Sequence, residues 1–428
     1  MRHTRSRRPR ATRGRALGTL AAAAVLALSL CAVAAGAGTP LLRRQVRLVP
    51  WDTASPGARS AAAAVQDLAS RANPGLSIYI GNEGALDPYS YIRRNWCVDN
   101  PRSVPEMVVI RDTWLPELAR YLQPIDGRAA EQMLKDYPQS VRDRLSFAGR
   151  AYGIPWRVDA NCLLYNKAHF ETVGALPPRT WDELVIAARR CHRPPEIYGF
   201  GLPGVRDDGA AELALQLLWA QGADLPPVQE PEALDKAAVT ATLGRILALH
   251  SVSEPEVLSW NRQELEEFFA AGRLAMLVSD KAYQDRLAAT PPEFGFATCA
   301  LPRGVQGTGL LSVELLCVFR AGSEAEAAMG VMRSLASAEA CERLLIGGGV
   351  PFHTKTMEKL RLDPRHAPYV QTLAESRGLP AQRWAPVADM LSETLAWLLT
   401  GRKSVEEATD FLAERMAQGE APSLRPGG

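Results

Sequence analysis

The chain has few of the residues that usually carry out catalysis or hold a metal ion. Only six histidines occur among 428 residues, and no two cysteines have the Cys-x-x-Cys spacing of a metal knuckle. The three glycines at 347–349 are not followed by Lys-Ser or Lys-Thr, so they do not form a phosphate-binding loop. No nucleophile elbow is present either. We therefore expect a protein with no cofactor, no bound metal and no enzymatic activity.

The chain also lacks a strong excess of charge. It has 49 Lys and Arg against 47 Asp and Glu, a formal net charge of +2, and part of the Arg content is concentrated near the N-terminus. There is no basic stripe interleaved with aromatic residues, which argues against a nucleic-acid partner. With 47% hydrophobic residues, the chain can form one large domain or two ordinary ones.

Residues 1–44 are typical of a signal peptide or an N-terminal membrane anchor. Seven arginines up to Arg15 precede an uncharged stretch rich in Ala and Leu at 16–39. Three outcomes stay open: cleavage near the small residues at 32–37, lipidation of Cys31, or retention as an anchor, since about 20 apolar residues span a bilayer. Cys31 ends a sequence that resembles a lipobox, although Leu30 replaces the usual small residue. Each outcome exports residue 45 onward to the periplasm or the outer face of the cytoplasmic membrane.

Six cysteines remain after Cys31. Their even number fits disulfides in an oxidising compartment, and buried free thiols fit equally well. The spacing does not pair them. They are Cys97, Cys162, Cys191, Cys299, Cys317 and Cys341.

Strand and helix patterns alternate after the export segment. Strands are expected at 46–49, 76–80 and 107–110, with helices at 58–72 and 89–96 between them. This βαβ series predicts a parallel sheet, in which ligands lie at the carboxyl ends of the strands. Polar and aromatic residues follow all three strands. They are Trp51, Asp52, Glu83, Asp112 and Trp114.

The stretch at 151–184 combines a joint, a buried strand and a capped helix. A short apolar run at 162–165 predicts the strand, and a polar segment at 157–161 precedes it. Thr180 and Glu183 have the spacing of a capping box before an apolar-periodic helix. We interpret the polar segment as the place where the chain crosses from one lobe to another, beside a ligand.

Five motifs in a fixed order carry a family resemblance. They are PEMVVI at 105–110, YGIP at 152–155 with LLYNK at 163–167, PPRTWDEL at 177–184, FFAAGRLAM at 268–276 and GRKSVEEA at 401–408. Together they resemble the extracellular solute-binding proteins of ABC importers, in the carbohydrate-binding group that includes maltose-binding protein.

The resemblance implies an α/β, two-lobed periplasmic-binding-protein fold with a ligand cleft at an interlobe hinge. Lobe 1 would comprise 46–157 with 312–350 returning to it, and lobe 2 would comprise 158–311 with 352–428 completing it. Hinge closure would trap a small solute, first of all a carbohydrate. The protein would be a monomer that delivers this solute to the permease subunits of an ABC transporter.

A sugar offers hydroxyl groups to carboxylates and apolar faces to aromatic rings. Trp219 and Tyr165 also fit core packing, and Asp280 also fits a helix N-cap. Trp384 resembles, by its position, an aromatic residue used for stacking in maltose-binding proteins. Eight residues therefore join the five at the strand ends as candidates for ligand binding. They are Asp159, Tyr165, Trp219, Ser279, Asp280, Tyr283, Glu314 and Trp384.

Other functions fit the same features. A ligand-sensing subunit that signals to a membrane kinase would need the same cleft. A glycoside-acting enzyme could pair carboxylates among Asp52, Glu83 and Asp112. A cation or polyamine ligand is a further alternative, because the predicted cleft is rich in acidic residues.

Overall fold

A computed structural model describes residues 44–51, 56–85, 87–98, 103–204, 208–225, 234–305, 309–380 and 384–418. The predicted export segment with Cys31, and the candidate ligand residue Asp52, lie outside the described residues. None of the helices within these ranges combines the length and the apolar character that a bilayer span requires.

The larger sheet begins with the predicted βαβ series. Strands β1 (Arg44–Val49), β2 (Leu76–Ile80) and β3 (Met107–Arg111) pair in parallel, with β1 in the middle. Helices α2 (Pro56–Ala72) and α3 (Pro88–Asn95) follow the first two strands. The parallel arrangement expected from the sequence is confirmed, and it leaves the carboxyl ends of three strands at one edge of the sheet.

Three strands from later in the chain complete this sheet. They are β6 (Gly153–Ala160), β10 (Gly309–Val318) and β11 (Ser376–Gly378). Strand β10 pairs antiparallel with β3 on one side and with β6 on the other, and β11 pairs in parallel with the start of β10. The sheet is therefore mixed, and its centre comes from segments that are far apart in the sequence.

Shorter elements cover the larger sheet. They are η1 (Asp112–Trp114), α4 (Leu115–Leu118), η2 (Ala119–Tyr121), α5 (Gly127–Leu134), α6 (Gln139–Arg144), β4 (Ser146–Phe147), β5 (Arg150–Ala151), α13 (Ala325–Leu335), α14 (Ala338–Leu344), η5 (Leu345–Gly347), α15 (Thr354–Leu360) and α16 (Ala367–Ala374). Helix α4 is only one turn long, and the chain continues directly after Leu118 as the 3-10 turn η2.

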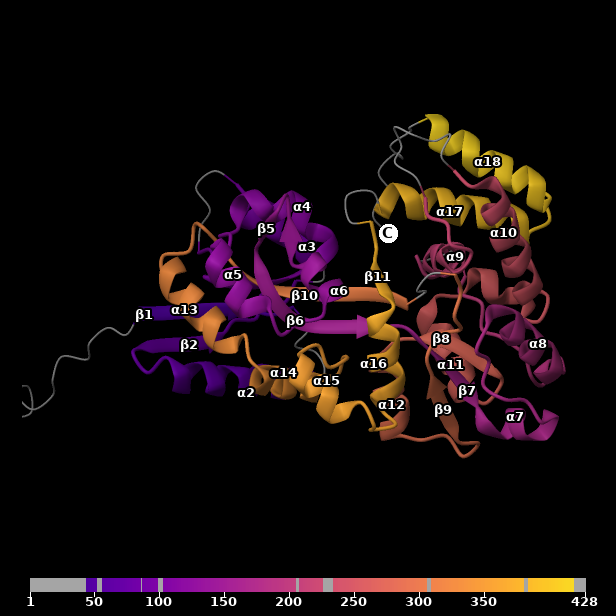
Figure 1. Ribbon diagram of the computed structural model, residues 1–428, viewed down its shortest axis with the longest axis horizontal. Coiled ribbons are helices and arrows are strands. Elements are labelled where there is room, and N and C mark those ends of the chain that lie inside the picture. Colours follow the sequence, from indigo (N-terminus) through magenta and orange to yellow (C-terminus); the bar gives the residue numbers. More distant parts are fainter. Residues whose placement is uncertain are drawn as a thin grey trace, which may run out of the picture.

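The smaller sheet has β7 (Cys162–Asn166) between β8 (Met276–Ser279) and β9 (Phe296–Cys299), all antiparallel. Helices lie around it on the right of Figure 1. They are α7 (Lys167–Val173), α8 (Trp181–Cys191), α9 (Gly209–Ala220), α10 (Lys236–His250), η4 (Pro255–Ser259), α11 (Arg262–Ala270), α12 (Lys281–Ala289), α17 (Trp384–Leu399) and α18 (Val405–Gln418).

The predicted cap of α8 forms only in part. The Thr180 side chain accepts a hydrogen bond from the Glu183 N–H at 3.2 Å, as expected. The Glu183 carboxylate, however, accepts the N–H of Arg179 at 2.7 Å. In a complete capping box, the Glu183 carboxylate would accept the backbone N–H of Thr180. Here it accepts the N–H of the preceding residue, Arg179, instead.

Two separate hydrophobic cores divide the chain. The first contains buried residues between Val46 and Cys162 and between Leu311 and Leu373, and the second contains those between Leu163 and Leu310 and from Trp384 onward. We propose that the lobe boundaries lie where the chain leaves one hydrophobic core and enters the other. They assign the buried Val158 and Tyr369 to lobe 1, whereas the sequence-based boundaries had assigned both to lobe 2.

Three neighbouring segments connect the two lobes. The first runs from β6 into β7, the second is the start of β10, and the third contains β11. Ala160 pairs with Leu311, and Gly309 pairs with Ser376, so the three segments share backbone hydrogen bonds where they pass between the cores. Figure 1 shows β6 and β10 side by side between the two groups of helices. We call these segments the first, second and third crossings.

All six described cysteines are free thiols. Cys162, Cys191, Cys317 and Cys341 are buried, and Cys97 and Cys299 are half-buried. The structure thus adopts the free-thiol alternative, in which a cysteine behaves as a small apolar residue.

The close approach of β6 and β10 gives a test of the crossing. A Cβ on Gly153 would lie 2.6 Å from the carbonyl oxygen of Leu316 and 2.9 Å from Sγ of Cys317. We expect Gly153→Ala to lower the free energy of unfolding by about 1–3 kcal/mol, as overpacking does, measured by urea denaturation. Gly75→Ala is the control, because a Cβ there meets nothing within 4 Å. Equal denaturation midpoints for both variants would contradict the packing described.

Candidate functional site

Acidic and basic side chains gather where the crossings pass between the lobes. Arg157 and Asp159 lie on β6, and Glu314 on β10 is paired with Arg157. Asp280 is the N-cap of α12 in lobe 2, and the next residue, Lys281, contacts Asp159. We call Arg157, Asp159, Asp280 and Glu314, together with the neighbouring Arg262, the hinge site.

Asp159 joins the first crossing to lobe 2. Its Oδ1 accepts the backbone N–H groups of Ala160 at 2.9 Å and Lys281 at 3.1 Å, and its Oδ2 accepts a hydrogen bond from Nη2 of Arg157 at 3.1 Å. Only 14% of its side chain is exposed. The carboxylate is therefore positioned mainly by protein groups, and it fixes the start of α12 against the crossing strand.

The electrostatics show that the hinge-site groups act on one another. The pKa of Asp159 is raised to about 6, first by burial and then by the negative charge of Asp280, while Arg157 and the Lys281 N–H act to lower it. Burial acts to lower the pKa of Arg157, but the charges of Asp159, Glu314 and Asp280 outweigh it, so that pKa lies above its ordinary value. Arg157, Asp159, Asp280 and Glu314 are thus close enough for their charges to influence one another.

The open side of the hinge site is formed by Asp280 and Arg262. Asp280 caps α12 with Oδ1, which accepts the Tyr283 N–H at 2.8 Å, and its Oδ2 lies 3.9 Å from Nη1 of Arg262. Arg262 also pairs with Glu212 at 2.8 Å. The side chains of Asp280 and Arg262 are 27% and 38% exposed, so both are accessible to a solute.

Sequence reasoning missed three residues of this region: Arg157, Arg262 and Glu212. The polar alternation at Arg157 and Asp159 was a signal for the first, because it places both side chains on the same face of a strand. Arg262 and Glu212 lie in the first turns of ordinary helices, α11 and α9. Nothing local distinguishes them from other charged helix residues.

Other lobe 2 candidates are buried and already use their polar atoms within the protein. Ser279 donates to Oε1 of Glu266 at 3.0 Å, and the Tyr283 hydroxyl donates to the Glu266 carbonyl at 2.6 Å. Trp219, only 2% exposed, donates to Asp224. We leave these three out of the proposed site, because their side chains complete the lobe 2 core.

Trp384 and Tyr165 also pack against the lobe 2 core. Trp384 is 8% exposed, and its Nε1 donates to Oδ2 of Asp208 at 3.0 Å. Tyr165 is half-buried, with its ring centroid 4.7 Å from that of Phe170. Tyr165 keeps part of its side chain exposed, whereas Trp384 is buried, and a ligand role for either residue stays a prediction.

In lobe 1, Trp51 belongs to an aromatic cluster at the end of β1. Its Nε1 donates to the Val109 carbonyl at 2.7 Å, and its ring lies 5.9 Å from Tyr91 and 5.7 Å from Trp96. Glu83 accepts a hydrogen bond from the Tyr91 hydroxyl at 2.9 Å. The structure therefore brings Trp51 and Glu83 together, since both contact Tyr91.

Asp112 and Trp114 lie at the end of β3, as predicted, but with different surroundings. Asp112 is 5% exposed and pairs with Nε of Arg144 at 2.6 Å; burial raises the pKa of its carboxyl group, and Arg144 opposes that rise. Trp114 is half-buried, with its ring 5.4 Å from Tyr89 and Arg111 stacked over it. Trp114 is thus partly exposed, whereas Asp112 is enclosed.

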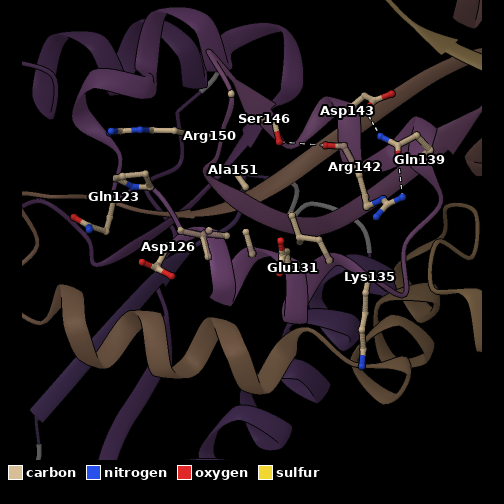
Figure 2. Close-up of a pocket in the computed structure, with 16 residues that line it drawn as sticks. Gln123, Asp126, Glu131, Lys135, Gln139, Arg142, Asp143, Ser146, Arg150 and Ala151 are labelled. Carbon is tan, nitrogen blue, oxygen red and sulfur yellow. Dashed lines mark hydrogen bonds between the residues drawn. The ribbon is translucent and has the colours of Figure 1, made fainter.

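A surface hollow of about 680 Å³ lies in lobe 1, apart from the crossings. Residues between Gln123 and Ala151 line it, and Figure 2 shows that Gln139 bridges Arg142 and Asp143 at its edge. Most of its polar lining is exposed to solvent, and we assign no ligand to it.

The hinge site can donate and accept several hydrogen bonds, but its groups are not arranged for metal binding. Among the residues that the structure describes, no three His, Cys, Asp or Glu side chains are grouped so that they could hold a metal ion. The arrangement suits a polar organic solute that offers both donors and acceptors.

Comparisons with known proteins identify relatives of the chain. A binding protein of Brucella abortus is 24% identical over 208 residues, which are 47% of this chain and 50% of that protein. The chain thus spans about half the length of the first curated relatives it matches. The mannitol-binding protein of Pseudomonas aeruginosa is 37% identical over 87 residues, 20% of each protein.

The fold is shared with solved structures. The sugar-binding protein MalE from Xanthomonas citri has a TM-score of 0.75 and 21% identity, and the match covers 88% of this chain and 97% of that one. The family model of the bacterial extracellular solute-binding proteins matches residues 102–340, more than half of the chain. The expected two-lobed α/β fold is confirmed, and the chain belongs to the family of bacterial extracellular solute-binding proteins, whose members are not enzymes.

Proposed function

We propose that this protein captures a carbohydrate or a related polyol between its two lobes and delivers it to an ABC import permease. The observation that carries the proposal is the hinge site itself. Accessible charged groups, Asp280 and Arg262, stand beside three hydrogen-bonded crossings about which two separate cores can rotate. Binding between the lobes would close the hinge over the solute.

The chemistry of the site supports a polyhydroxylated solute. Each hydroxyl group both donates and accepts, so it can join a carboxylate such as Asp280 to a guanidinium such as Arg262. Trp114 supplies a half-buried ring at the end of β3 for an apolar sugar face. Two of the similar proteins bear the names of a mannitol-binding and a sugar-binding protein, which agrees with this ligand class.

The proposed role places the protein outside the cytoplasm, as its family name implies. The sequence-based alternative of a glycoside-acting enzyme is wrong, because the family to which the chain belongs is not catalytic. A sensor subunit would bind its ligand in the same way but hand the closed form to a membrane kinase. Pull-down from membranes distinguishes these partners, since a kinase without a permease would rule out transport.

A ligand screen tests the proposed function directly. We expect the melting temperature of the protein to rise with one or more sugars or polyols, because a solute that binds only the folded state stabilises it by mass action, by about 2.7 kcal/mol at a hundredfold excess over Kd. Differential scanning fluorimetry against a sugar library measures this. A flat response to all sugars and polyols, with a shift for amines or peptides, would refute the ligand class.

Asp280 provides a test of the site. Asn is also a good N-cap, so Asp280→Asn keeps the cap of α12 and removes the charge beside Arg262. We expect the affinity for the solute from the screen to fall by about tenfold, equivalent to ~1.4 kcal/mol, with an unchanged melting temperature. Asp235→Asn, at the N-cap of α10, is the matched control and should bind normally. Equal affinities for the two variants would exclude Asp280 from the site.

The pKa of Asp159 predicts how stability depends on pH. Its value of about 6 exceeds the ordinary 3.8, so the folded protein holds this proton more tightly than the unfolded chain. The resulting contribution to stability is complete below about pH 4 and is lost as the pH rises through about 6. Urea denaturation across this range should show a steeper fall in the free energy of unfolding for the wild type than for Asp159→Asn. Parallel pH curves would show that Asp159 is not buried as described.

A further inference from the structure

The predicted ligand residue Asp112 takes part in a buried arrangement that is separate from the ion pairs of the hinge site. Its Oδ2 is 2.6 Å from Nε of Arg144, and the two side chains are 4% and 17% exposed. Replacing a buried ion pair by apolar residues is often neutral or stabilising, so such a pair is weak evidence for stability alone. The role of this pair is better judged from the segments of the chain that its two side chains contact.

Asp112 connects the end of β3 to strand β10 within lobe 1, just after the second crossing. Its Oδ1 accepts the N–H of Thr113 at 2.9 Å, and the carboxylate also accepts a backbone hydrogen bond from Val313 on β10. Thr113 belongs to η1, the turn that carries Trp114. The carboxylate therefore fixes the orientation of a proposed ligand-contacting turn relative to a strand that passes between the lobes.

Arg144 extends this connection to the third crossing. Its Nη2 donates to the carbonyl oxygen of Leu379 at 2.8 Å, while Nε is used by Asp112. Gly378 packs against the same guanidinium, because a Cβ at that position would lie 2.3 Å from Nε and 2.5 Å from Cζ. One side chain of lobe 1 thus holds two consecutive residues of the third crossing.

The neighbouring residue of the third crossing is held by lobe 2. Arg377 forms an ion pair with Asp224, and its guanidinium carbon lies 4.7 Å from the ring centroid of Trp219 in the lobe 2 core. Arg377 and Gly378 are adjacent, so the two lobes hold this segment from opposite sides. Strand β11 has only three residues, so backbone pairing holds only a short part of the third crossing.

We infer that Arg144 is a positioning residue that sets the angle between the two lobes, and with it the affinity for the solute, by fixing the third crossing to lobe 1. The part that concerns affinity rests on the proposed function. The part that concerns the lobe angle does not, because it applies to the protein without a ligand. A lysine could not replace Arg144, since one ammonium group lacks the planar fork that reaches both Asp112 and Leu379.

Two variants test the inference by different means. Arg144→Lys keeps the charge but removes the fork, whereas Gly378→Ala keeps every polar atom and pushes the guanidinium away. Gly75→Ala is the control, because a Cβ there meets nothing within 4 Å. Spin labels on cysteines introduced at the exposed Gln132 and Glu414, after the half-buried Cys97 and Cys299 are replaced by Ser, report the distance between the lobes by double electron–electron resonance.

We expect the interlobe distance distribution of the ligand-free protein to broaden in both variants and to stay unchanged in Gly75→Ala. The solute found by the ligand screen should bind about fivefold more weakly, because a less restricted hinge must be ordered on binding. The double variant should change affinity no more than either single variant, since both act on one contact.

Some outcomes would overturn the inference. Variants that melt at lower temperature but keep the wild-type distance distribution would show that Arg144 only stabilises lobe 1. If Arg144→Lys does not fold, Gly378→Ala alone decides between these results. A broadened distribution in a protein that binds no sugar or polyol would support the role of Arg144 in the hinge and refute the proposed function, so the two failures are distinguishable.

Discussion

The hydrogen-bonded pairing of β6 with β10 is the constraint on which the rest of the molecule depends. These strands are separated by about 150 residues of sequence, yet Ala160 and Leu311 pair at the point where the chain leaves one core for the other. The pairing brings the first and second crossings together, and β11 adds the third. Because backbone groups need partners when water is excluded, we expect the crossings to keep their contact while the lobes rotate in the proposed closure.

The same pairing explains where the charged groups are found. Strand β6 places Arg157 and Asp159 on one face, β10 places Glu314 opposite Arg157, and the start of α12 completes the group with Asp280. Burial disfavours the charged form of Asp159, and the ion pair with Arg157 offsets that only in part. The charges are therefore kept beside the hinge at a cost in stability, which is expected of residues retained for binding rather than for folding.

Sequence reasoning predicted the family and the parallel part of the sheet, because β1, β2 and β3 are short-range βαβ units with clear apolar patterns. It did not predict β6 as a full strand, since its partner β10 is distant in sequence and Arg157 and Asp159 looked like a polar loop. Trp219 was assigned to a ligand although α9 is buried on nearly every face. Arg144 was missed because its helix, α6, has only six residues and too little periodicity to recognise.

In the proposed function, a solute binds between two lobes that rotate about the three crossings. Small-angle X-ray scattering of the protein with and without a saturating sugar or polyol tests this claim most directly. We expect the radius of gyration to decrease when the solute binds, as the lobes close over the hinge site. A solute that binds tightly but leaves the radius of gyration and the scattering profile unchanged would contradict it.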